Sequence, residues 1–101
     1  MNYLDELRDV IHHLHGAKAT HRESVPVKEV WEGQTVWEGI VEVFDLHDHP
    51  KANTAYAWTH DTDSGSKRSV AVLQVPPVVS PITAVRAAIA QEFRANAAAQ
   101  A

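Results

Sequence analysis

Apolar residues recur with the spacing of an amphipathic helix at both ends of the chain. The first such segment predicts a helix from Tyr3 to about Gly16, with an apolar stripe of Leu4, Leu7, Ile11 and Leu14. The second begins where Ser80 can cap a helix and Pro81 can occupy its first turn. Its stripe is Ile82, Val85, Ile89 and Phe93. Residues from about 95 to 101 are Ala-rich, continue no stripe and are predicted to fray.

Between these segments the apolar residues alternate with polar ones, or run continuously, as they do in β-strands. A tight turn at residues 32–35, with Gly33 supplying a positive φ, predicts that the first two strands form a hairpin. Pro26 indicates an edge strand, because proline has no N–H to donate, and Gly39 suggests a bulge. The polar segments 17–24 and 47–53 are predicted to be connections. The expected strands are Val25–Trp31, Thr35–Leu46, Ala55–His60 and Arg68–Val75.

This order of elements predicts a single α+β domain over residues 1–101, in the order α-β-β-β(-β)-α. The sheet should be antiparallel and contain three or four strands. Two helices and one sheet pack most simply as two layers, with both helices on one face of the sheet. The other face would then meet water, a ligand or a second subunit.

Aromatic and apolar residues occupy both faces of the predicted strands. Tyr56 and Trp58 share one side of their strand, because alternate residues project to the same face. A monomer normally exposes apolar patches of only about 300–600 Å², so the second face should be covered, most simply by a twofold copy of the chain. A small apolar ligand is another possible occupant. The candidate residues for binding a ligand or partner are Trp31, Trp37, Phe44, Tyr56 and Trp58.

Composition narrows the classes of function. The chain contains no cysteine, which excludes disulfides and thiolate chemistry and fits a reducing cytoplasm. Its net charge of -4 argues against a nucleic-acid binder, because phosphate contacts need clustered Lys and Arg. No apolar stretch approaches the ~20 residues that span a membrane, and Met1–Glu6 has neither a basic leader nor an apolar signal region. A cytoplasmic domain without a membrane partner is therefore expected.

Seven histidines are unusual in a chain of this length. His47 and His49 follow the long strand. If the strand continues that far, these alternate residues project to one side and both could ligate a divalent transition metal. Asp45, Asp48 or a histidine of the first helix could complete such a site. The alternative is that residues 47–53 form an ordinary polar loop that binds no cofactor, since one His-x-His spacing is weak evidence for a metal site.

The order helix-strand-strand-strand-helix also occurs in double-stranded-RNA-binding domains. Those domains use clustered basic residues at the start of the last helix. Here that helix opens with Ser80–Thr83, and only Arg86 and Arg94 follow. RNA binding is therefore the weakest alternative.

The segments Val36–Phe44 (VWEGIVEVF) and Val75–Val85 (VPPVVSPITAV) resemble the small uncharacterised α+β proteins that are found on integron gene cassettes. This resemblance implies a bacterial, mobile-element origin and an accessory role. It implies no catalytic residues.

The sequence therefore favours a non-enzymatic binding or interaction module. We expect a homodimer that pairs through the aromatic sheet face or through an edge strand. The alternative is a metal-binding protein, or a metal-dependent enzyme, that uses the histidine-rich end built around His47 and His49.

Overall fold

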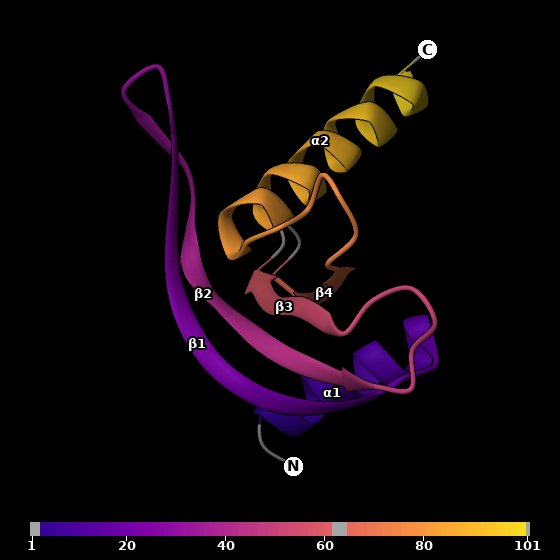
Figure 1. Cartoon of the computed structure of the whole chain (residues 1–101). Coiled ribbons are helices and arrows are strands. Elements are labelled where there is room, and N and C mark those ends of the chain that lie inside the picture. Colours follow the sequence, from indigo (N-terminus) through magenta and orange to yellow (C-terminus); the bar gives the residue numbers. More distant parts are fainter. Residues whose placement is uncertain (1–2, 62–64, 101) are drawn as a thin grey trace.

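Two helices and one four-stranded antiparallel sheet make up the fold (Figure 1). The computed structural model describes residues 3–61 and 65–100, and the side chains of residues 3–60 and 65–91. The strands lie in chain order across the sheet, so β1 and β4 are its edges. The predicted α+β class and antiparallel sheet are confirmed. The elements are α1 (Tyr3–His15), β1 (Lys18–Trp31), β2 (Gln34–His47), β3 (Thr54–Asp61), β4 (Lys67–Leu73) and α2 (Pro81–Gln100).

Capping residues mark the end of α1 and the start of α2. α1 ends at Gly16, whose φ of 68° is the left-handed conformation of a helix C-cap and whose N–H donates to the His12 carbonyl at 2.8 Å. At the start of α2, the Ser80 hydroxyl accepts the Thr83 N–H at 3.4 Å. α2 continues to Gln100, through the part of the tail that was predicted to fray, and residue 101 lies outside the described residues. Neither helix combines the length and apolar character that crossing a bilayer requires, in the part of the chain that is described.

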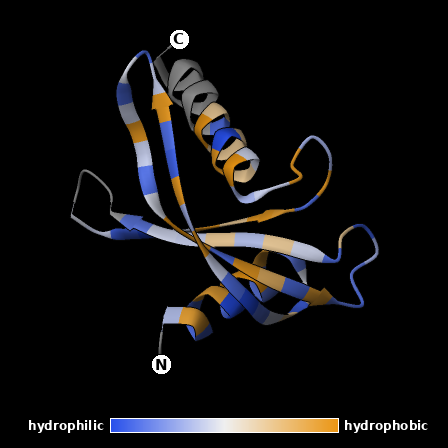
Figure 2. Ribbon diagram, turned by 60° about the vertical axis from the view of Figure 1, so that its left-hand side comes forward, coloured by the Kyte–Doolittle hydropathy of each residue, from blue (hydrophilic) through white to orange (hydrophobic). Residues whose placement is uncertain are grey.

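The two helices pack on opposite faces of the sheet, so the expected two-layer arrangement with both helices on one face is not what the structure shows (Figure 2). α1 buries Leu7 and Ile11 in one cluster with Phe44, whereas α2 buries Val85 in another with Val43. Val43 and Phe44 are neighbours on β2 and therefore point to opposite faces. The physical reason is that the central strands are apolar on both sides, and each side requires its own cover.

β1 begins at Lys18, so the predicted connection 17–24 is mostly strand. This half of β1 pairs with the end of β2, from Lys18 opposite His47 to Ser24 opposite Glu42. This half of β1 is mostly polar, which is why the sequence pattern did not indicate a strand. A polar composition suits an edge strand, because polar side chains there discourage pairing with other chains. The predicted edge position of the strand that contains Pro26 is confirmed.

The hairpin of β1 and β2 extends well beyond the rest of the sheet. β2 pairs with β3 only from Glu42 to Asp45. The remainder of the hairpin, Val25–Val41, rises past β3 as a separate two-stranded ribbon (Figure 1), and we call it the arm. The arm is therefore the part of the sheet with the fewest neighbours.

The turn and the register of the arm differ in detail from the sequence prediction. The turn is centred on Glu32 and Gly33, which both have positive φ, and so lies one residue earlier than expected. The bulge is not at Gly39, which pairs regularly with Val27. The register instead shifts where Val36 is the additional residue of β2.

Candidate interaction site

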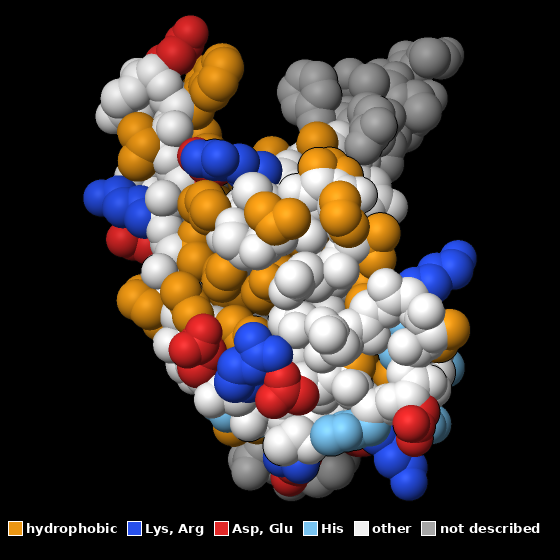
Figure 3. Space-filling view, in the orientation of Figure 1, with side chains coloured by type: hydrophobic (Ala, Val, Ile, Leu, Met, Phe, Trp, Pro, Cys, Tyr) orange, Lys and Arg blue, Asp and Glu red, His pale blue; other side chains and the backbone are white. Residues whose placement is uncertain are grey.

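The arm has an inner face that packs against α2. Val27 is buried there at 7% exposure. The Trp37 indole covers Gly39, where an added Cβ would lie 3.1 Å from Trp37 Cη2, and it meets Trp58 edge-on with ring centroids 5.7 Å apart. Farther along the arm, Glu29 accepts a hydrogen bond from Arg86 of α2. The inner face thus attaches the arm to the body of the protein, and Figure 3 shows hydrophobic side chains filling the space between the arm and the segment before α2.

The opposite side of the arm, its outer face, remains exposed. Val30 and Ile40 have exposed fractions of 48% and 46%, and Val36 at the bulge has 49%. Lys28 lies directly opposite Glu38 in the hairpin register, between these apolar residues. The residues of the outer face are Pro26, Lys28, Val30, Thr35, Glu38 and Ile40.

β2 also presents an open edge along the arm. Residues 34–41 have β1 on one side and no described strand on the other. Below this edge, where the arm leaves the sheet, a pocket of about 290 Å³ is lined by Tyr3, Ile40, Thr59, His60 and Lys67. This pocket has a mixed polar and apolar lining. The small apolar ligand is untested and stays a prediction.

The five candidate aromatic residues have different environments. Phe44, Tyr56 and Trp58 are buried at 4% exposure or less and belong to the core. Trp37 is half-buried on the inner face of the arm, and Trp31, 69% exposed near the turn, is the one with most of its surface available.

Sequence reasoning missed the outer face of the arm. One signal was present in the sequence: the predicted strand Thr35–Leu46 is longer than the predicted strand Ala55–His60, as the observed β2 with 14 residues is longer than β3 with 8. A long hairpin beside a short neighbour must leave part of its length without cover. In the part of the hairpin that extends past β3, every second residue on the outer side is exposed, including Lys28, Glu38 and Ile40.

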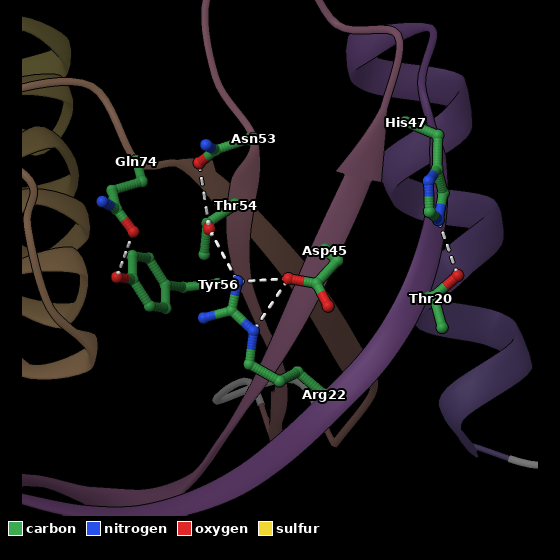
Figure 4. A network of polar contacts seen from close by, with 8 residues as sticks. All are labelled: Thr20, Arg22, Asp45, His47, Asn53, Thr54, Tyr56 and Gln74. Atoms are coloured by element: carbon green, nitrogen blue, oxygen red, sulfur yellow. Dashed lines mark hydrogen bonds and ion pairs between the residues drawn. The ribbon is translucent and has the colours of Figure 1, made fainter.

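A polar network joins three strands at the other end of the sheet (Figure 4). Arg22 is the additional residue of β1 in its register with β2, and its guanidinium donates to Asp45 and, at 3.1 Å, to Thr54. The hydrogen bond from Arg22 lowers the pKa of the Asp45 carboxyl below its usual value. Nearby, the Tyr56 hydroxyl donates to Gln74 at 2.8 Å, and burial raises the pKa of this phenol. These groups satisfy one another, which is typical of a structural network.

A cluster of three polar side chains lies where the arm joins the rest of the sheet, a place that we call the foot of the arm. It consists of Ser24, His21 and Glu42. Glu42 is buried at 5% exposure and accepts hydrogen bonds from the Ser24 hydroxyl and, at 2.9 Å, from His21 Nε2. A catalytic triad needs the serine and the carboxylate on different imidazole nitrogens. Here both lie beside Nε2, with the serine oxygen 3.5 Å away. The arrangement supports a buried carboxylate and does not activate a nucleophile.

The histidines named as metal ligands already have protein partners. His47 is exposed, and its Nε2 shares a hydrogen bond of 2.7 Å with the Thr20 hydroxyl. His49 Nδ1 accepts two backbone N–H groups of its own loop, each at 3.1 Å. Asp45, named as a third ligand, contacts Arg22 instead. Among the described residues no group of three or more His, Cys, Asp or Glu side chains is placed to hold a metal ion. The metal site stays a prediction.

Comparison with protein-family models, with curated proteins and with solved structures gives no match to this chain. The resemblance to integron cassette proteins and the RNA-binding alternative are therefore untested and stay predictions. The structure has four strands between its helices, one more than the RNA-binding order considered above.

Proposed function

We propose that this protein is a non-enzymatic interaction module that forms a homodimer through the outer face of its arm. The observation that carries the proposal is the exposure of Val30 and Ile40, at 48% and 46%, on a ribbon whose other face is held against α2. Covering these exposed apolar side chains with a partner would remove them from water, which favours association.

Apolar residues on both faces of the sheet do not by themselves require a dimer. α1 covers one face and α2 covers the other, so the central strands need no second subunit. The arm is different, because it extends past β3. α2 packs along its inner face, whereas α1 approaches its outer face near Ile40, in the pocket that Tyr3 also lines. An exposed hairpin with an open edge strand favours association with another chain. Closed twofold dimers are the commonest form of such association.

The polar clusters favour a structural role over an enzymatic one. Glu42 is satisfied by Ser24 and His21, and Asp45 is satisfied by Arg22. In the first cluster Ser24 and Glu42 both lie beside His21 Nε2, so the imidazole does not stand between the hydroxyl and the carboxylate as it does in a catalytic triad.

Sedimentation velocity of the full chain over a wide concentration range tests the proposal. The wild-type chain should sediment as a dimer at high concentration. Ile40→Lys should shift it to monomer, because the dimer would have to bury a charge in the contact. Leu14→Lys is the matched control, since Leu14 is an exposed apolar residue of α1 with 57% exposure and should leave association unchanged. A wild-type chain that stays monomeric throughout would overturn the proposal.

A further inference from the structure

We infer that the two arms stack outer face to outer face about a twofold axis that runs along the arm, so that Lys28 of each copy meets Glu38 of the other. This inference rests on the proposed homodimer and specifies its symmetry. It follows from the placement of two opposite charges side by side on one exposed ribbon.

The register fixes the relative positions of these charges. Lys28 and Glu38 are direct partners across the hairpin, and both are exposed. Direct cross-strand partners have Cβ atoms about 4.5–5.5 Å apart. The outer face therefore has a positive side on β1 and a negative side on β2 at the same height along the arm.

Two twofold axes would stack this face on a copy of itself. An axis along the strands exchanges the β1 side with the β2 side, so Lys28 of one copy lies over Glu38 of the other. An axis across the strands at the height of this pair places Lys28 over Lys28 and Glu38 over Glu38. The same axis placed between two rows sets each charge over an uncharged residue of the next row, such as Lys28 over Val30. Like charges brought together in an interface disfavour association, and opposite charges favour it. The charge pattern therefore selects the axis along the arm.

The neighbouring rows fit the same axis. Pro26 lies opposite Ile40 on one side of the charged pair, and Val30 lies opposite Thr35 on the other. Rotation about the axis along the arm sets Pro26 over Ile40 of the second copy, and Val30 over Thr35. The charged pairs would thus be flanked by less polar contacts, at a separation of about 10 Å between the stacked ribbons.

Charge reversal tests this geometry. Lys28→Glu and Glu38→Lys should each weaken the dimer by about tenfold or more at low salt, because each brings like charges together across the interface. An equal mixture of the two variants should recover dimers that contain one chain of each kind. The mixture matters because each variant keeps its own unfavourable cross-strand pair, so recovery reports contact between chains. Lys18→Glu is the matched control for Lys28→Glu, because it changes the net charge by the same amount and in the same direction at an exposed position at the far end of β1.

The outcomes separate this inference from the proposed function. A monomeric wild-type chain would overturn both. If Ile40→Lys disrupts the dimer while Lys28→Glu and Glu38→Lys leave it intact, the homodimer stands and this symmetry is wrong. A response to Glu38→Lys alone would indicate pairing through the open edge of β2, which also contradicts the stacked geometry.

Discussion

Glu42 brings a carboxylate into the interior of the protein, and two side chains of β1 compensate for its loss of water. It is 5% exposed, and Ser24 and His21 both donate to it. Burying a carboxylate is costly unless hydrogen bonds replace those of water. Ser24 lies directly opposite Glu42 in the hairpin register, immediately below the arm. This pair therefore bears on the stability of the foot of the arm.

Ser24→Ala should lower the free energy of unfolding by about 1–3 kcal/mol, because it removes a donor from a buried carboxylate. Urea unfolding followed by tryptophan fluorescence measures the change. Thr20→Ala is the control. Thr20 lies on the same strand as Ser24, but its hydrogen bond to His47 of β2 joins two exposed side chains, so its loss should cost no more than about 0.5 kcal/mol. Equal effects of the two substitutions would show that the Ser24–Glu42 contact has no special importance.

The turn of the arm holds a non-glycine residue in a strained conformation. Glu32 has a φ of 51°, beside Gly33 with 79°. Two positive φ values are the signature of the type I′ turn, which prefers Asn-Gly because asparagine tolerates the left-handed region better than glutamate does. The hairpin therefore forms despite a suboptimal residue in its turn.

Glu32→Asn should stabilise the protein by about 0.5–1 kcal/mol, because it relieves this strain. The rise in melting temperature should be seen by circular dichroism at a concentration where the chain is monomeric. Glu23→Asn provides the same chemical change at an exposed strand position of β1 and should give no stabilisation. A loss of stability in Glu32→Asn would mean that the glutamate makes a compensating contact.

The elements that sequence reasoning predicted are those with strong local signals. α1 follows from its apolar stripe and Gly16, α2 from Ser80 and Pro81, and the hairpin from Gly33. The first half of β1 was missed because its side chains are polar and carry no apolar alternation, although His21 and Ser24 hydrogen-bond to the buried Glu42. Local composition cannot distinguish such a segment from a loop.

At the scale of the whole molecule, the placement of the helices could not be predicted from local patterns. A strand that is apolar on both sides requires two covers, but its sequence does not say whether a helix or a second chain supplies them. Here one helix supplies each, which assigns Phe44 to the side of α1 and Tyr56 and Trp58 to the side of α2. The outer face of the arm is exposed because β3 pairs with β2 only from Glu42 to Asp45, and the sequence alone does not give this register. The candidate site thus depends on long-range pairing.

The three tryptophans lie at increasing distance from the core and can report which face of the arm a partner covers. Trp58 is 2% exposed, Trp37 is half-buried and Trp31 is 69% exposed. Trp31 alternates with Val27 and Glu29 along β1, which places it on the inner side of the arm, away from the outer face.

Acrylamide should therefore quench chiefly Trp31, and the Trp31→Phe variant should lose most of the quenchable emission. In the wild-type chain the quenching should be the same at concentrations that favour monomer and at those that favour dimer, because stacking through the outer face leaves Trp31 accessible. The Leu14→Lys variant, which should associate normally, provides a matched comparison. If quenching falls as the dimer forms, the partner covers the inner side or the tip of the arm. The interface would then have to include Trp31, and the outer face would lose its assigned role.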